Sequence, residues 1–350
     1  MRTLARVISL PLLATFAWFA SAASAVTIDW VTVGDPGNPC DVQPEGCFGS
    51  VAYTYRISKY EITNAQYAEF LNAVAADDPN WLYDPRMAGA PGAQPLGESG
   101  ITQTGASGTF SYSVSSGFAN KPVTHITIDQ ASRFANWLHN GQPTGAQGST
   151  TTEDGAYTFT GLFSVGTRNP GATIFVTSED EWYKAAYYDA ASMSYFDYPT
   201  GTNTPPVCAA PTATPNRANC QWALEAVTDV GAYPGSASPY GTFDQGGNVY
   251  EWNESIIFLE SAEQGIRGGG FRGPLVLLAA SSRDHDFPRD GDNDGGFRVA
   301  SLVPEPGTGL LVMAGLLGIV AWRRGGDLAC RASQPSTATA RVEELHARGR

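Results

Sequence analysis

The sequence has little charge, and little of that charge is positive. Only 16% of the 350 residues are charged, and 21 Lys and Arg stand against 34 Asp and Glu, which gives a formal net charge of −13. Because nucleic-acid binding requires clustered Lys and Arg to neutralise phosphates, this balance argues against a nucleic-acid partner. An acidic surface suits an exported protein that holds cations, and it is also typical of soluble proteins in general.

The sequence also lacks several patterns that would indicate a specific chemistry. It has no C-x-x-C pair, no G-x-S-x-G elbow, no periodic repeat and no long linker between residues 51 and 302. These absences argue against a thiol-redox motif, an α/β serine hydrolase, a repeat array and a division into two domains. Gly (39) and Pro (23) are abundant instead, so we expect one loop-rich α+β domain with few helices and short antiparallel strands.

The five cysteines are distributed as in an exported protein. Cys330 falls in a polar C-terminal tail, which leaves Cys40, Cys47, Cys208 and Cys220 for the domain. Four cysteines permit three connectivities, and the sequence does not choose among them. Short spacing favours two local bridges, Cys40–Cys47 and Cys208–Cys220, formed in an oxidising compartment.

The N-terminus has the order of a secretory signal peptide. Arg2 and Arg6 precede an apolar run at 7–20, and Ala23-Ser24-Ala25 supplies small residues before a cleavage site. The apolar run is short for a membrane span. We therefore expect residues 1–25 to be removed as a signal peptide and residues 26–50 to lead into the domain.

The segment at 303–324 carries a second targeting pattern. It consists of a Pro-Glu-Pro motif, an apolar run and a basic pair, namely Pro304, Glu305, Pro306, residues 307–322, Arg323 and Arg324. Sixteen apolar or small residues form a helix of about 24 Å, just short of the roughly 30 Å hydrocarbon core. Arginines after such a helix stay cytoplasmic, which leaves the preceding chain outside.

This segment resembles the PEP-CTERM sorting signal. The resemblance implies handling by an exosortase in the inner membrane of Gram-negative bacteria that export polysaccharide. It also implies a transient membrane anchor through 307–322 and a final location at the cell surface or in the extracellular matrix. A plain C-terminal anchor is the alternative. Proteins with this signal usually end soon after the arginines, whereas here a polar tail follows at 325–350, which we expect to be disordered.

Three helices are indicated by the same N-terminal device. Each begins with a capping box, in which a hydroxyl residue is followed three positions later by Gln or Glu: Thr63 and Gln66, Thr127 and Gln130, Ser178 and Glu181. Apolar residues at helical spacing follow, namely Tyr67, Phe70, Leu71 and Val74, then Ala131, Phe134, Ala135 and Leu138, then Trp182, Ala185 and Ala186. We expect a short β-like run before each helix, such as 53–60 and 172–177.

Six blocks of the sequence together point to one family. They are KYEITNAQYAEFLNAV at 59, KPVTHITIDQASRFANWL at 121, VTSEDEWYKAAYYD at 176, YGTFDQGGNVYEW at 240, IRGGGF at 266 and GGFRVA at 295. In this order they resemble the formylglycine-generating-enzyme, or sulfatase-modifying-factor, domain over residues 51–302. The resemblance implies a variant of the C-type lectin fold.

The resemblance further implies a calcium site in the Gly-rich turn of the fourth block. Its ligands would be the side chain of Asp244, the carbonyl oxygens of Gly247 and Val249, and the side chain of Glu251. Ca²⁺ takes six to eight oxygens, and a Gly-rich turn lets carbonyl groups point inward. The alternative is a tight turn before a core strand, with Glu251 paired to an arginine. A second family site would begin near Asn219, but no acid can be assigned to it.

The chain departs from the family where the family's chemistry resides. Family oxidases carry two cysteines just beyond the RGG block, which bind copper and oxidise a cysteine of the client sulfatase. Counting from Arg267, those positions hold Gly273 and Leu278, and the stretch 267–283 contains no cysteine. A thiolate is both the copper ligand and the redox group, and neither Gly nor Leu can replace it. We therefore expect calcium but not copper.

Three other signals have weaker interpretations. The G-x-G-x-x-G match at 268–273 lies in no βαβ unit, which argues against nucleotide binding. The acidic run at 290–295 copies the start of an EF-hand loop, but its twelfth position is Ser301 and we expect a strand to follow, so a solvated loop is favoured. The scattered histidines, among them His125, His139 and His285, have no metal-ligand spacing.

Two classes of function stay open, and a third is less specific. We favour a non-catalytic binding module for a peptide, a glycan or a matrix polysaccharide, with Trp81, Tyr83 and Tyr240 as candidate contacts unless they belong to the core. The alternative is an enzyme, a formylglycine-generating-type or related sulfatase-modifying oxidoreductase. A structural spacer of the extracellular matrix is the third hypothesis.

Overall fold

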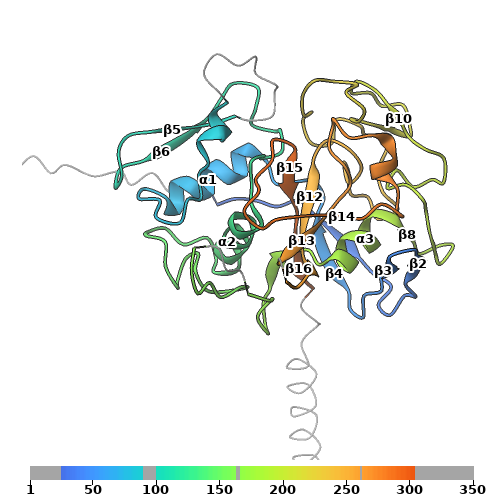
Figure 1. The fold of residues 1–350 in the computed structure, drawn as a ribbon, viewed down its shortest axis with the longest axis horizontal. Helices are drawn as coiled ribbons and strands as arrows, with labels where there is room; N and C mark the ends of the chain where they lie inside the picture. The colour runs from blue at the N-terminus through green and yellow to red at the C-terminus, as the bar shows by residue number, and fades with distance from the viewer. Residues whose placement is uncertain (1–24, 90–99, 163–165, 261, 304–350) are drawn as a thin grey trace, which may run out of the picture. The chain divides into compact units, whose positions relative to one another are not determined.

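Two four-stranded sheets carry the fold (Figure 1). The structure is a computed structural model and describes residues 25–89, 100–162, 166–260 and 262–303. The first sheet has the order β1-β4-β16-β7 and is antiparallel throughout. Its strands are β1 Trp30–Val33, β4 Tyr55–Ser58, β16 Val299–Leu302 and β7 Ile174–Val176. The first and last strands of the described chain therefore belong to one sheet.

The second sheet has the order β14-β13-β12-β15, and its strands come from the C-terminal third of the chain. They are β14 Asp284–Asp286, β13 Glu263–Arg267, β12 Tyr250–Phe258 and β15 Gly295–Phe297. β12 pairs antiparallel with β13 and parallel with β15. Because β12 starts at Tyr250, the Gly-rich turn of the fourth block leads directly into a central strand of this sheet.

Short hairpins and loops occupy much of the remaining chain. The two-stranded pairs are β2 Asp41–Gln43 with β3 Gly46–Phe48, β5 Ile101–Thr104 with β6 Ser111–Val114, β8 Tyr188–Asp189 with β9 Ser194–Tyr195, and β10 Val207–Cys208 with β11 Arg217–Ala218. Two 3₁₀ turns are η1 Pro85–Ala88 and η2 Leu275–Leu278. The prediction of a loop-rich α+β fold with few helices is confirmed. The prediction of antiparallel strands is wrong for two pairs, β10 with β11 and β12 with β15, which are parallel.

The described residues contain three α-helices, and all three lie where the sequence predicts them. They are α1 Asn64–Val74, α2 Ile128–His139 and α3 Glu179–Tyr187. Each N-cap hydroxyl accepts a hydrogen bond from the backbone N–H three residues on, and the side chain there accepts from the N-cap N–H, so all three capping boxes are formed. The predicted run before α2 is reduced to an isolated bridge between Thr63 and Pro122, so that part of the prediction is wrong.

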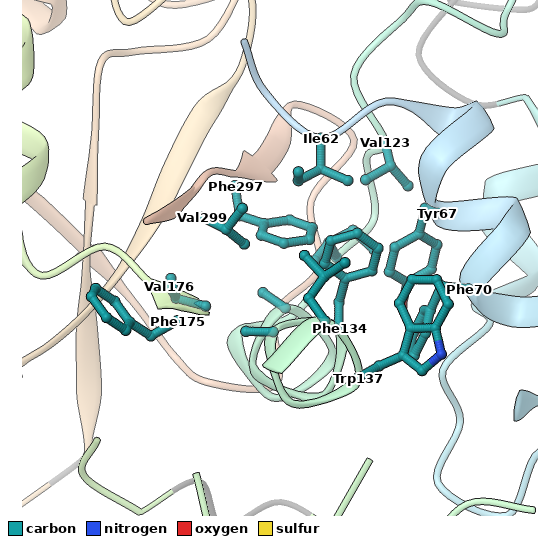
Figure 2. Close-up of a cluster of buried hydrophobic side chains, with 14 of the residues drawn as sticks. Ile62, Tyr67, Phe70, Val123, Phe134, Trp137, Phe175, Val176, Phe297 and Val299 are labelled. Carbon is teal, nitrogen blue, oxygen red and sulfur yellow. The ribbon is translucent and has the colours of Figure 1, made fainter. Parts of the chain in front are cut away.

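Aromatic side chains of α1 and α2 form the main core (Figure 2). Phe70 of α1 contacts Phe134 and Trp137 of α2, with ring centroids 5.3 Å apart in both pairs. Phe134 also meets Phe297 of β15 at 5.5 Å, which joins the helices to the second sheet. The predicted apolar positions of all three helices are buried. Edge-to-face ring packing of this kind adds to the free energy gained from burial itself.

Buried ion pairs fix α3 against the second sheet. Glu179 in its first turn accepts from Arg267 at the end of β13 and from Arg283, each with an N–O distance of 2.7 Å. Glu181 accepts from Arg168, also at 2.7 Å. Carboxylates in the first turn of a helix are further stabilised by the helix dipole.

The targeting segments fall outside the described residues. These are the signal sequence up to residue 24, the Pro-Glu-Pro motif with its apolar run and arginines, and the tail at 325–350. Among the residues that the structure does describe, none of the helices combines the length and the hydrophobicity that crossing a membrane would require.

Candidate functional site

The Gly-rich turn is packed against two neighbouring loops at backbone distance. Gly247 and Asn248 have φ angles of 85° and 61°, in the left-handed region. A Cβ atom on Gly247 would lie 2.4 Å from the carbonyl oxygen of Asn219, and one on Gly268 would lie 2.8 Å from that of Gln245. Glycine is therefore required at both positions, because the chain segments approach too closely for any side chain.

Asn248 holds these loops together with its side chain. Its Oδ1 accepts from the backbone N–H of Thr228 at 2.8 Å, and its Nδ2 donates to Oε1 of Glu61 at 3.1 Å. Its backbone N–H donates to the carbonyl of Asn219, and its own carbonyl accepts from Phe271. The side chain and backbone of this one buried residue thus link the turn to the segments at 61, 219–228 and 271, and its polar groups are satisfied as burial requires.

Glu251 is bound by an arginine and a tryptophan. Arg298, between β15 and β16, donates from Nε to both carboxylate oxygens at 2.9 and 2.7 Å. Nε1 of Trp182 donates to Oε2 of the same carboxylate at 2.8 Å. Arg298 and Glu251 are both fully buried, so this is a charge-assisted interaction with little solvent screening.

Two further carboxylates lie near the same guanidinium. Nη2 of Arg298 is 3.5 Å from Oε2 of Glu61 and also donates to the carbonyl of Phe243. Burial, and next the charge of Asp244, raise the pKa of Glu61 well above its usual range. Burial also raises the pKa of Asp244, to about 6, although Oδ2 accepts from the Gly231 N–H at 2.6 Å. Burial raises the pKa of Glu251 too, against the opposing effect of Arg298.

The side chains of the predicted calcium ligands Asp244 and Glu251 are engaged by donors of the protein in this arrangement. Both oxygens of Glu251 accept hydrogen bonds from Arg298, and Asp244 accepts from a backbone amide. Within the described ranges, no group of three or more acidic, His or Cys side chains is placed to hold a metal ion. The arrangement is that of the alternative interpretation, a tight turn before a core strand with Glu251 paired to an arginine. Calcium binding itself stays a prediction.

The two positions that hold cysteine in family oxidases lie in and before the η2 turn. Leu278 is fully buried, and it packs with Ala218 and Cys220. Gly273 is partly exposed, and its carbonyl accepts from the N–H of Gln221. These positions therefore contribute packing and a backbone contact, and neither offers a metal ligand.

A disulfide bridge lies beside this position. The structure joins Cys208 to Cys220 and Cys40 to Cys47, the pairing that short spacing favours. Cys208 and Cys220 pack in the same apolar cluster as Leu278, although they come from a loop some sixty residues earlier in the chain. As a closed bridge, this pair supplies no thiolate to a metal.

The candidate aromatic residues differ in their surroundings. Trp81 is 60% exposed, whereas Tyr83 is buried. Both line a cavity of about 510 Å³ between the loop after α1, β5 and the start of α2. Tyr240 lies elsewhere, with its hydroxyl donating to Asp35 at 2.9 Å. The structure therefore brings two of the three candidates together.

The acidic run at 290–295 also has a structural neighbourhood of its own. Strand β15 follows it, as the sequence predicts. Its aspartates line a second, smaller cavity of about 240 Å³ together with His285, whose Nδ1 is 2.5 Å from the Glu263 carboxylate. His125 is buried near the carbonyl of Gly291, and His139 contacts Thr173.

The sequence did not single out the residues on which the turn depends. Arg298, Glu61 and Asn248 are all buried, yet each stands inside a quoted block without a recognised role. One signal was available, since Arg298 interrupts the apolar run from Phe297 to Ala300. A buried arginine needs a buried acidic partner. This requirement predicts that the partner is Asp or Glu, but it does not predict which residue of the sequence it is.

Two family models match this chain. Residues 50–303 match the sulfatase-modifying factor enzyme 1-like domain. Residues 302–324 match the PEP-CTERM protein-sorting motif. The second match supports export and placement at the cell surface or outside the cell.

The chain is also similar to individual proteins. It is 24% identical over 256 residues to a hercynine oxygenase of Mycolicibacterium smegmatis, and the match covers 67% of this chain and 50% of that protein. It is 26% identical over 255 residues to a hercynine oxygenase of Mycolicibacterium thermoresistibile, and the match covers 67% of this chain and 48% of that protein. The chain thus spans about half the length of the curated relatives it matches.

Two solved structures share the fold. The first is CarF, with a TM-score of 0.50 and 18% identity, and the match covers 79% of this chain and 99% of CarF. The second is Treponema denticola variable protein 1, with a TM-score of 0.52 and 16% identity, and the match covers 81% of this chain and 98% of that protein. At this identity the similarity shows the fold alone.

The raised pKa of Asp244 predicts a pH dependence of stability. The ordinary pKa of an aspartate is about 3.9, whereas that of Asp244 in the folded protein is about 6. At a pH between these two values the folded state keeps a proton that the unfolded chain has lost. The free energy of unfolding therefore falls as pH rises through this window. Asp244→Asn keeps an acceptor for the Gly231 N–H but carries no charge. We expect it to remove this part of the fall and to raise the melting temperature at pH 7 to 8, with Asp197→Asn, at an exposed carboxylate, as control.

A calcium site would give the opposite sign. Asp244→Asn would then remove a ligand and lower the melting temperature in Ca²⁺, and a chelator would lower that of the unchanged protein. Because Arg298 already pairs with Glu251, a melting temperature that the chelator leaves unchanged would mean that the arginine alone neutralises this carboxylate.

Proposed function

The chain belongs to the family of the sulfatase-modifying factor enzyme 1-like domain, and on this premise we propose that it is an exported, exosortase-sorted protein whose domain binds a ligand without oxidising cysteine. The observation that carries the proposal is the burial of Leu278 at a position where the family's oxidases hold a thiol. The ligand would be a peptide, a glycan or a matrix polysaccharide.

The segment 267–283 supports the proposal that this chain does not carry out the oxidase reaction. A copper site of that kind needs two thiolates, and this stretch of the chain contains no cysteine. Leu278 is enclosed by apolar neighbours and by the Cys208–Cys220 bridge, so the site that the thiol would occupy is filled by packing. The scaffold around it, including the Gly-rich turn and its arginine, is retained.

The cavity beside Trp81 supports a binding role. Its volume of about 510 Å³ is within the usual range of small-molecule sites. Burial of a large apolar ring stabilises a protein, yet Trp81 stays 60% exposed beside this cavity. A cavity with an exposed tryptophan at the cell surface suits a recognition module.

An enzymatic alternative rests on the names of the relatives. Hercynine oxygenases share 24% identity with this chain, but the chain spans only half of their length. Their activity belongs to the whole of those proteins. The alternative function for this chain is that of a sulfatase-modifying-type oxidoreductase.

Copper and peptide oxidation assays separate the two functions. We expect the purified full chain to bind no Cu(I) with thiolate affinity and to leave a cysteine-containing peptide unoxidised in air, because no thiolate is present in 267–283. A family member that carries both cysteines is the positive control. Turnover above the no-enzyme rate would contradict the proposal, and its loss in Cys208→Ser would assign the activity to that bridge.

The sorting proposal has its own test. Replacing Pro304, Glu305 and Pro306 together with Ala should leave membrane insertion intact, because the apolar run at 307–322 drives insertion. Processing and release should be lost, which fractionation and the apparent mass of the protein would measure. Arg323 and Arg324 exchanged for Lys serve as a charge-preserving control. Release of the triple variant at the normal rate would indicate a plain anchor instead.

A further inference from the structure

The cavity beside Trp81 is built from five separate parts of the chain, one of which contributes Arg289. The loop after α1 contributes Trp81 and Tyr83, β5 contributes Gln103, and the start of α2 contributes Gln130 and Arg133. The fourth part is represented by Leu162. Nothing in the family's oxidase chemistry involves this cavity, which is lined by neither Gly273 nor Leu278.

The loop that carries Trp81 is held rigidly by hydrogen bonds. The Asp78 carboxylate accepts from the backbone N–H groups of Leu82 and Tyr83, both at 2.9 Å, and from the side chain of Gln147 at 2.7 Å. Nε2 of Gln130 donates to the carbonyl of Trp81 at 2.7 Å. The ring therefore projects from a fixed backbone, and little conformational entropy is lost when a ligand contacts it.

Trp81 itself is held in an unfavourable conformation. Its φ angle of 53° is left-handed, a region that bulky residues rarely adopt, and its side chain is 60% exposed. Folding thus tolerates backbone strain in order to place a large ring at the mouth of a cavity. Trp222 shares a left-handed φ angle and an exposed ring, so the adjacent cavity is what distinguishes Trp81.

Charge compensation within the protein favours a neutral ligand. Asp84 is paired with Arg86 at 2.7 Å, and Arg133 is paired with Glu153 at 2.9 Å. Asp78 accepts from three N–H donors of the loop. Asp129 and Arg289 line the cavity as well, and each also has an interaction partner in the chain. The charged groups of the lining are therefore already engaged, and an ionic ligand would have to compete with their present partners.

The geometry of β5 disfavours an extended peptide. One edge of β5 pairs with β6. On the other side, the Tyr83 hydroxyl donates to the Ile101 carbonyl at 3.1 Å and accepts from the Gln103 N–H at 3.4 Å. Because these backbone groups are engaged by a side chain, a peptide cannot extend the sheet at this edge by strand addition.

We propose that this cavity binds a neutral oligosaccharide, with a pyranose ring stacked on Trp81. The inference rests on the proposed binding function and names its ligand class. The C–H groups of a sugar face carry partial positive charge and suit the negative face of an indole. Sugar hydroxyls both donate and accept, which matches a lining of amides and hydroxyls such as Asn80, Gln103 and Thr127.

The chain offers a matched control for the test. Trp222 is 54% exposed, has a φ angle of 58°, and lies outside the cavity beside Arg272. Glycine adopts left-handed φ without strain, so Trp81→Gly and Trp222→Gly each remove one exposed ring while preserving the backbone. Trp81→Phe keeps a smaller aromatic face. Circular dichroism and melting curves would verify that all three variants fold.

The experiment measures binding of cellohexaose and maltohexaose, two neutral hexose oligomers, to the full chain by saturation-transfer NMR and calorimetry. A galacturonic acid hexamer, a chitosan hexamer and a cysteine-free peptide library are the comparison probes. We expect a neutral hexaose to bind, Trp81→Gly to weaken it by roughly 10- to 30-fold, and Trp222→Gly to leave it within about twofold. Trp81→Phe should give an intermediate affinity.

Three results would overturn the assignment. One is no binding of either neutral hexaose, and another is equal affinity in Trp81→Gly. The third is a charged oligomer or a peptide that binds through Trp81 more tightly than the hexaoses, which would reject the saccharide class while leaving a binding module in place. Oxidase turnover in the copper experiment would reject the proposed function instead, so the two failures are distinguishable.

Discussion

Arg298 has no exposed surface, and separate segments of the chain close around its guanidinium. It donates to Glu251 at the start of β12, to the Ser58 carbonyl of β4 and to the Phe243 carbonyl before the turn. The partners come from both sheets and from the loop between them. Burial of a guanidinium costs several kcal/mol unless its donors are engaged, so these contacts must form together.

The Gly-rich turn is arranged around this interaction. Left-handed backbone at Gly247 and Asn248 brings the turn close to the loops at 219 and 268. The N–H of Gly247 donates to the carbonyl of Gly268 and that of Asn248 donates to the carbonyl of Asn219. The segment that follows Gly268 ends in the η2 turn, where the family's oxidases carry their thiols. Leu278 fills its position with apolar packing against the Cys208–Cys220 bridge and makes no hydrogen bond through its side chain, so thiols can be absent there while the scaffold remains. The recognition proposed at Trp81 would use another part of the surface.

Local features of the fold could be predicted from the sequence, because their causes are local. The capping boxes at Thr63, Thr127 and Ser178 lie within four residues of their partners, and each marks a helix correctly. The pairing of Glu251 with Arg298 spans 47 positions, and nothing near either residue identifies the other. The calcium prediction was drawn from the turn alone and did not include Arg298, which pairs with Glu251.

The exposure of the candidate aromatic residues also depends on distant parts of the chain. Trp81 and Tyr83 are two residues apart in one loop, yet the first is exposed and the second is buried against Tyr112. Their difference arises from packing with β5 and β6, which the loop sequence does not encode. The cavity they line needs segments more than fifty residues apart, so no motif could have indicated it.

A double-mutant cycle tests the central claim, that Arg298 is the cation of the turn. Urea unfolding of the full chain would be measured for Glu251→Gln, Arg298→Met and the double variant, with and without a calcium chelator. Each single change should cost about 3–5 kcal/mol, and the double change should cost less than their sum by about 1–3 kcal/mol, independently of the chelator. Additive losses, or a coupling that appears only when Ca²⁺ is present, would contradict the account.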